Sequence, residues 1–324
     1  MTTPNIKQVI HFRGLGNMGS KVIYLSSLIQ PSRFIFQKGF FNPDSLTVDN
    51  LATLTKYGIL YQTNIFSESR PDFYVDFTHD ANPWIETLTK DSIVVVQSNN
   101  YGLGSLLIPP LLYERKSMDN VIRAPDCSLS GVIPFLSKIS KFFLSINVMV
   151  LTDKSQSEND SKHAFYFSDS FTRRRSKEMA DLLLKPVTVT SISSPQIGPF
   201  YMANISGQID QIAILNNYQS FAKFEKDAFS QYVEDYQRIS ISIDDNTCKY
   251  QLPPEPKTIS EFIDQYSKVW LKPHIVYFRR SFVRRRDQIS LTIGFDANLT
   301  AALSNLDIFD YLLQYSLPKI TISQ

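Results

Sequence analysis

The sequence contains few of the residues that build disulfide frameworks and most catalytic sites. Its 324 residues include only two cysteines and four histidines. The cysteines, Cys127 and Cys248, lie far apart and form no framework, which is typical of a protein from a reducing compartment. Any acid–base chemistry must draw on very few imidazoles.

Long apolar runs are also missing. No stretch approaches the roughly 20 apolar residues that a membrane-spanning helix needs. The N-terminal MTTPNIKQ lacks the apolar core of a secretory signal. We therefore expect no membrane span and a cytoplasmic location.

Charge of one sign is not in excess, because the 33 Lys and Arg residues nearly balance the 31 Asp and Glu residues. A net charge of +2 gives no strong global attraction to nucleic acid, and we expect no such partner. Two triplets, Arg173–Arg175 and Arg284–Arg286, stand out locally. They can be anion sites, docking sites for an acidic partner, or solvated strand edges that discourage edge-to-edge pairing.

The first part of the chain alternates between strand and helix patterns. Short apolar runs at 8–12, 33–37, 73–77 and 92–98 read as strands, and the helical patterns at 20–29 and 45–58 fall between them. A helix that stops at Gly58 fits the last of these. This order predicts a parallel, doubly wound sheet.

The pattern changes near residue 125. Alternating apolar runs at 185–193, 200–209, 237–243, 275–282 and 288–295 predict a largely antiparallel sheet with helices on one face. Helical patterns cover 128–144 and 221–236, and an amphipathic helix covers 297–317. We expect a first domain over 1–125, an α+β domain over 126–296, and a last helix that packs back on the first domain.

Gly14, Gly16 and Gly19 form G-x-G-x-x-G between the first strand and the first helix. The first glycine permits a tight turn, the second lets backbone approach a pyrophosphate, and the third lets helix and strand pack closely. The helix N-terminus then offers amide donors to phosphates. The loop predicts a Rossmann-type domain that binds NAD or NADP, or one in which the glycines serve packing only.

The end of the second strand bears on which dinucleotide is bound. A free ribose 2′-hydroxyl usually meets an acid there, but the sequence reads F-Q-K-G, with Gln37 and Lys38. Lys38 favours the 2′-phosphate of NADP, unless it is simply a solvated lysine. Asp44 follows a little later and could reach a ribose.

Cys127 stands in RAPDCSLSG, where a helix of the second domain is expected to begin. A thiol in a first helical turn feels a dipole that favours the thiolate, whereas the neighbouring Asp126 opposes it. The residue is either a nucleophile or a buried, inert cysteine.

Several segments, in this order, resemble the glyceraldehyde-3-phosphate dehydrogenase family, nearer its archaeal type. They are FRGLGNMGSKV, FQKGFFNPDS, FYVDFTHDANPW, CSLSG, VTVTSISSPQIGPFYMANISGQI, TISEFIDQYSKVW, IVYFRRSF and the final helix. The resemblance implies a Cys127 nucleophile, phosphate sites in the second domain at Arg173, Arg174 and Arg175, and a homo-oligomer or another protein partner. It implies cofactor contacts at Gly14, Gly16, Asn17, Met18, Gly19, Lys38 and Thr78.

The sequence departs from that family at the residue that activates the thiol. The archaeal type has a histidine pair where this chain reads SDSFTRRRSKEMADLL, and the bacterial-type alignment places Leu151 there. Leu129 is apolar in what should be a polar turn. Of the histidines, only His163 is a candidate to approach Cys127, because His11 lies inside a strand and His79 lies on the cofactor side.

We therefore expect a catalytically degenerate relative of these dehydrogenases, a pseudoenzyme that acts as a binding or assembly component, with or without bound NAD(P). The alternative is an active, phosphorylating NADP-dependent aldehyde dehydrogenase with an altered substrate. A redox or metabolite sensor that uses Cys127 is the third hypothesis. No spacing of ligands predicts a metal.

Overall fold

The structure is a computed structural model, and it divides into two compact units. The first unit comprises Met1–Asp126, Pro256–Asp264 and Ala301–Gln324, and the second comprises Cys127–Glu255 and Gln265–Thr300. The residues that it describes are 7–29, 33–41, 46–63, 71–78, 92–97, 104–107, 120–133, 136, 140–153, 166–167, 169–194, 200–218, 220, 223, 277–285 and 288–315. Within these ranges, no helix is both long enough and apolar enough to cross a bilayer.

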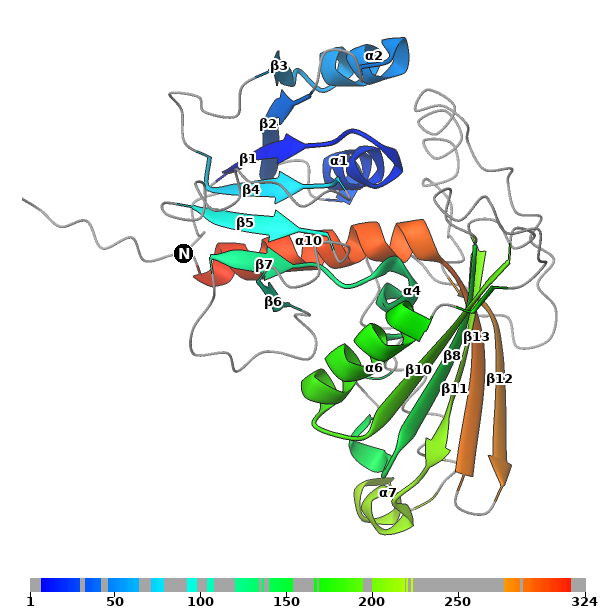
Figure 1. The fold of residues 1–324 in the computed structure, drawn as a ribbon. Coiled ribbons are helices and arrows are strands. Elements are labelled where there is room, and N and C mark those ends of the chain that lie inside the picture. Colours follow the sequence, from blue (N-terminus) through cyan, green and yellow to red (C-terminus); the bar gives the residue numbers. More distant parts are fainter. Residues whose placement is uncertain are drawn as a thin grey trace, which may run out of the picture. The chain divides into compact units, whose positions relative to one another are not determined.

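The first unit contains a seven-stranded parallel sheet in the order β3-β2-β1-β4-β5-β7-β6 (Figure 1). Its strands are β1 (Gln8–Arg13), β2 (Phe34–Phe40), β3 (Leu60–Gln62), β4 (Phe73–Asp76), β5 (Ile93–Val96), β6 (Ser105–Leu106) and β7 (Val121–Arg123). The helices α1 (Asn17–Ile29) and α2 (Val48–Lys56) connect strands of this sheet. The expected parallel, doubly wound sheet is confirmed.

Local sequence signals fix the ends of α2. The Oγ1 atom of Thr47 accepts a hydrogen bond from the amide of Asn50, which makes Thr47 the N-cap. Gly58 has φ +64° just beyond the helix, a conformation that favours glycine. The helix therefore stops at the glycine that the sequence indicated.

The last helix, α10 (Ala297–Tyr315), packs on one face of the parallel sheet through Phe309. The Phe309 ring lies 5.7 Å from Phe34 and 5.1 Å from Phe73, centroid to centroid. A guanidinium nitrogen of Arg33 donates a hydrogen bond of 2.8 Å to Asp310. These contacts confirm that the C-terminal helix returns to the first domain.

The second unit contains a six-stranded sheet in the order β12-β13-β11-β8-β10-β9. Its strands are β8 (Ile146–Asp153), β9 (Tyr166–Phe167), β10 (Val187–Ser194), β11 (Phe200–Gln208), β12 (Tyr277–Arg285) and β13 (Gln288–Asp296). Only β8 and β10 pair in parallel, and the other neighbours are antiparallel. The largely antiparallel sheet is confirmed, and α6 (Asp169–Leu183) packs against β10 (Figure 1).

One expected helix differs from the structure, and one helix was not expected from the sequence. The pattern over 128–144 does not give one helix, since α4 (Cys127–Ser130) ends in a turn at 131–132 and a short 3-10 helix, η2 (Ser140–Phe142), follows. The segment 169–183, which contains the arginine triplet, forms α6. The helix expected at 221–236 lies outside the described residues except for residue 223. The strand expected at 237–243 lies wholly outside them, and α7 (Gln211–Tyr218) precedes both segments.

Candidate functional site

The glycine loop joins β1 to α1 in the first unit. Gly14 has φ +88°, and a Cβ there would lie 2.9 Å from Cγ2 of Thr78. A side chain at this position would be strained by its backbone and crowded by its neighbour. Gly14 therefore supplies the tight turn that the sequence pattern predicted.

Gly16 and Gly19 have different surroundings, as expected if Gly16 lets a pyrophosphate approach the backbone and Gly19 lets helix and strand pack closely. A Cβ at Gly19 would lie 2.6 Å from the carbonyl oxygen of Gly14 and 3.0 Å from the Phe77 ring, so this glycine allows close packing of α1. A Cβ at Gly16 would meet nothing within 4 Å, and Gly16 is exposed. The loop is thus tightly packed at its first and third glycines and open at its second.

The start of α1 stands beside this open position. Asn17 is the first residue of the helix, and Met18, half-buried, is the second. The first amides of a helix have no intrahelical acceptor and carry the positive end of its dipole. Together with exposed Gly16, they make a surface suited to a pyrophosphate.

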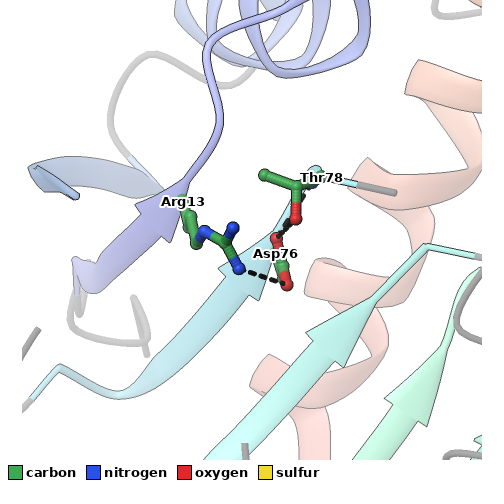
Figure 2. Close-up of polar contacts among 3 residues, drawn as sticks. All are labelled: Arg13, Asp76 and Thr78. Carbon is green, nitrogen blue, oxygen red and sulfur yellow. Dashed lines mark hydrogen bonds and ion pairs between the residues drawn. The ribbon is translucent and has the colours of Figure 1, made fainter. Parts of the chain in front are cut away.

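A buried carboxylate holds Thr78 against the glycine loop (Figure 2). Asp76 ends β4 and is completely buried. Its Oδ1 atom accepts hydrogen bonds from the Thr78 amide, at 2.9 Å, and from Thr78 Oγ1, at 2.7 Å. Its Oδ2 atom lies 3.8 Å from a guanidinium nitrogen of Arg13, the residue before Gly14. The three side chains join the ends of β1 and β4 beneath the loop.

Lys38 does not stand where the sequence reading placed it. The second strand was expected to end at residue 37, but β2 continues to Phe40, so Lys38 lies two residues before its end. Lys38 pairs with His11 of β1 in the register and is 9 % exposed, which also rules out a freely solvated lysine. Its contact with a 2′-phosphate stays a prediction, and Asp44 lies outside the described residues.

His11 is fully buried beside Lys38 and bonded to Gln37. The His11 Nε2 atom lies 3.0 Å from Gln37 Oε1, and because a carbonyl oxygen only accepts, Nε2 carries the proton. Burial lowers the pKa of His11 below 6.5, the Gln37 bond raises it in part, and the Lys38 charge lowers it further. His11 is therefore held neutral.

We expect this neutral histidine to make folding pH-dependent. Below pH 6.5 the unfolded imidazole takes up a proton that folded His11 resists, so the free energy of unfolding falls as the pH falls. Each unit of pKa lowering is worth about 1.4 kcal/mol. Urea unfolding between about pH 5 and pH 8 measures the free energy of unfolding at each pH. This free energy should change less steeply with pH for His11→Gln than for the wild type. Equal slopes would contradict the assignment.

A reciprocal amide pair, which the sequence did not predict, links β5 to α10. Gln97, directly after β5, donates to Asn305 Oδ1 at 3.1 Å, and Asn305 donates back to Gln97 Oε1 at 3.4 Å. Asn305 also donates to the Ala301 carbonyl oxygen and is 1 % exposed. An asparagine on the buried face of an amphipathic helix was the available signal. The pair fixes α10 at the carboxyl end of a central strand.

In the second unit, Cys127 is the first residue of α4 and is half-buried. Ser130 donates to the Cys127 carbonyl oxygen at 2.8 Å, and its Oγ atom lies 3.0 Å from Thr300 Oγ1. A Cβ at Gly131 would collide with the Phe295 ring. Leu129 is buried, which explains an apolar residue in this turn. The cysteine backbone is thus anchored to the junction of β13 and α10.

The histidines do not supply a described partner for Cys127. His11 belongs to the first unit, whereas His79, His163 and His274 lie outside the described residues. Among the described residues, no cluster of three His, Cys, Asp or Glu side chains could hold a metal. The role suggested for His163 stays a prediction.

The arginine triplet on α6 does not form one surface. Consecutive residues of a helix point about 100° apart. Arg173 is exposed, Arg174 is half-buried, and Arg175 is buried and donates to Ser191 Oγ of β10 at 2.7 Å. Arg175 therefore fastens α6 to the sheet. Arg284 and Arg285 of the second triplet fall on β12, which ends the order of the described strands, and Arg286 lies outside the described residues.

Comparison with known proteins supports this architecture. No protein-family model matches the chain, and no curated protein matches its sequence. The chain is similar to the crystal structure of aspartate semialdehyde dehydrogenase II from Vibrio cholerae, complexed with ASA. The match covers 95% of this chain and 99% of that chain, with a TM-score of 0.55 and 13% sequence identity. At this identity the likeness shows the fold alone: the chain has the fold of that aspartate semialdehyde dehydrogenase.

Proposed function

We propose that this protein binds NAD(P) in the first unit and is a catalytically degenerate relative of the glyceraldehyde-3-phosphate dehydrogenases, acting as a binding or assembly component. The observation that supports nucleotide binding is that the three glycines of the loop have different surroundings. Gly14 and Gly19 are packed so closely that neither accepts a Cβ, whereas Gly16 is open. A loop kept only for packing would have no need of an open, exposed glycine at the start of a helix.

Each of the residues around the glycine loop would have its own role in holding a dinucleotide. Gly16 and the first amides of α1 would bind the pyrophosphate, and Thr78, held by Asp76, would line the other side of the loop. When bound, NAD(P) supplies hydride transfer. The protein's part is to hold the phosphates and to keep Thr78 in place.

The case for degenerate chemistry is that the segment aligned with the family's histidine pair contains no histidine. An unassisted thiol has a pKa near 8.5 and is only a few per cent thiolate at neutral pH. General acid–base help contributes about 10²–10⁴-fold, so its loss leaves little turnover. The segment aligned with the family's histidine pair is α6, where the arginines cannot shuttle protons and Arg175 is bonded to Ser191.

Direct titration tests nucleotide binding. We expect quenching of intrinsic tyrosine and tryptophan fluorescence, or heat in a calorimeter, on addition of NADPH or NADH, with a Kd in the micromolar range, on the order of 1–100 µM. Comparing the two nucleotides decides whether the 2′-phosphate matters. No binding of either at about 1 mM would overturn the proposal.

A second candidate is an active NADP-dependent, cysteine-dependent aldehyde dehydrogenase. The anchoring of Cys127 at the start of α4, with its side chain only half-buried, favours it. In that case Cys127 attacks an aldehyde carbonyl, and the thiol proton leaves to His163 or to water.

Thiol reactivity distinguishes these candidates. If the protein is degenerate, iodoacetamide should alkylate Cys127 with a rate midpoint near the ordinary thiol pKa of about 8.5. Cys127→Ala identifies the signal that belongs to this thiol rather than to Cys248. We also expect no reduction of NADP with an aldehyde and phosphate above the Cys127→Ala background. A midpoint below about 7 would favour the enzyme or the sensor, and Cys127-dependent turnover would establish the enzyme.

A further inference from the structure

Helix α6 is followed by a residue that is unusual for its backbone conformation. Leu184 has φ +52°, and among the described residues it is the only one other than glycine with a positive φ. The Lys185 amide donates to the Ala180 carbonyl oxygen at 3.4 Å, which closes a Schellman motif with Leu184 at the C′ position. Glycine usually occupies this position, because a Cβ is disfavoured in left-handed backbone. A leucine here therefore stabilises the fold less than glycine would.

The Leu184 side chain is not buried in return. It is 88 % exposed, the largest fraction among the large hydrophobic side chains that the structure describes. Burial of an apolar side chain would offset an unfavourable backbone conformation, but in this chain water covers Leu184. Strained residues of this kind cluster at sites that bind other molecules. Leu184 thus points to a contact outside the chain itself.

Three more aliphatic side chains are exposed on segments close to Leu184. Leu144 follows the 3-10 helix η2, and Ile212 and Leu215 lie one turn apart on α7. Their exposed fractions are 51 %, 72 % and 47 %. Aliphatic residues exposed singly are ordinary, whereas a group of them marks an interaction site.

Hydrogen bonds hold the segments that carry these residues together. The Nζ atom of Lys185 donates to the carbonyl oxygens of Ser140 and Phe143, at 2.8 and 2.7 Å. The Leu144 amide donates to the carbonyl oxygen of Gln208, just before α7, at 2.8 Å. The end of α6, η2 and α7 are thereby joined at one end of the six-stranded sheet, where Figure 1 shows α7. We call the four side chains there the aliphatic end: Leu144, Leu184, Ile212 and Leu215.

Exposed charge at the aliphatic end is positive. The described segments 140–146, 183–187 and 208–218 contain three charged residues, Lys141, Lys185 and Asp210. Of these, only Lys141 is exposed, because Lys185 is held by carbonyl oxygens and Asp210 caps α7 through the amide of its third residue. Interfaces pair opposite potentials. A partner that complements this surface therefore carries apolar side chains with acidic ones beside them.

We infer that the aliphatic end docks an amphipathic helix of a partner protein, with an apolar stripe flanked by glutamate or aspartate. The exposed part of α7 also carries the amides of Gln211 and Asn216. These amides need hydrogen-bond partners when water leaves, and a polypeptide supplies them whereas lipid tails do not. Docking to an anionic membrane relies on clusters of Lys and Arg, which the one exposed lysine does not make. A second copy of this end would bring another Lys141 rather than an acid.

This inference gives the assembly role proposed above a docking surface, and its first test is stability. Leu184→Gly should raise the unfolding midpoint of the full chain by about 1–3 °C, because glycine adopts left-handed backbone without strain. The same substitution removes the most exposed side chain of the aliphatic end. We therefore expect a variant that is more stable and binds its partner less well. A midpoint that does not rise overturns the inference.

The binding test uses a synthetic helical peptide of about 18 residues, with leucines on one face and glutamates on the other. A matched peptide carries lysines in place of the glutamates. Fluorescence anisotropy with the full chain at about 50 mM salt should give a Kd of about 10–100 µM for the glutamate peptide and a Kd at least about 10-fold higher for the lysine peptide. Leu184→Gly and Leu215→Ser should each weaken binding of the glutamate peptide at least about 5-fold.

Leu51→Ser is the matched control, since Leu51 of α2 is 46 % exposed, close to the 47 % of Leu215, and lies in the first unit. It should leave peptide binding unchanged. Absence of binding up to about 1 mM, equal binding of the two peptides, or wild-type affinity in Leu184→Gly or Leu215→Ser overturns the inference.

Two further measurements separate the other occupants. Cosedimentation with phosphatidylserine vesicles that is lost in Leu184→Gly would assign the surface to a membrane, and a dimer that this variant dissociates in light scattering would assign it to a second copy. Either result overturns the inference. NADPH titrations of the same variants should match the wild type, so that a failure of nucleotide binding is recognised separately from a failure of this docking surface.

Discussion

Gly16→Val should abolish nucleotide binding while leaving the fold intact. The new side chain enters open space, because a Cβ at Gly16 meets no atom within 4 Å. Its branched methyl groups would occupy the position from which backbone amides of the loop and α1 approach the pyrophosphate. We expect the affinity for NADPH to fall at least about 100-fold and the unfolding midpoint to move by less than about 2 °C.

Gly19→Ala is the matched comparison, and it should lower the stability of the fold rather than the affinity for NADPH. Its single added carbon would lie 2.6 Å from the Gly14 carbonyl oxygen, so α1 must shift against β1. We expect a loss of about 1–3 kcal/mol in the free energy of unfolding, as for other overpacked sites. Thermal melts should therefore show the larger loss of stability in Gly19→Ala, and NADPH titrations should show the larger loss of affinity in Gly16→Val. Wild-type affinity in Gly16→Val would remove the open glycine from the site and with it the main support for nucleotide binding.

The sequence predicted the sheets well because their signals are local. Short β-branched and aromatic runs, interrupted by helical periodicity, indicated a parallel sheet and then a mainly antiparallel one. The second strand was expected to end at residue 37, whereas β2 continues through Gly39 to Phe40. In the structure Gly39 is a strand residue at which a Cβ would collide with the Phe41 and Phe12 rings. A glycine needed for close packing looks the same in sequence as one needed for a turn.

The candidate site was only partly predictable, because its supports come from distant segments. Nothing near Gly14 in the sequence shows that Arg13 will face Asp76, and Gln97 and Asn305 lie 208 positions apart. The register of β1 against β4 and the return of α10 bring these pairs together. Glycine spacing therefore predicts the loop, whereas only the fold shows which buried groups hold it.

Arg13→Leu should destabilise the first unit more than Arg13→Leu/Asp76→Asn does. Asp76 is fully buried, and removing Arg13 alone leaves its carboxylate without its ion pair. Loss of one partner of a buried pair costs more than neutralising both. Because the Arg13 side chain is 26% exposed and the separation is 3.8 Å, we discount the cost of the single variant to about 2 kcal/mol.

Asp76→Ala should cost more than either, since it also removes both hydrogen bonds to Thr78 and leaves a cavity. We expect about 3 kcal/mol and weaker NADPH binding, because Thr78 is released from the loop. Asp72→Ala is the matched control just before the same strand: exposed, with one bond of 2.7 Å to the Val9 amide, it should cost about 1 kcal/mol or less. Urea unfolding measures all four. Equal losses in Asp76→Ala and Asp72→Ala would show that the buried carboxylate does not hold the loop, and that packing at Gly14 and Gly19 suffices.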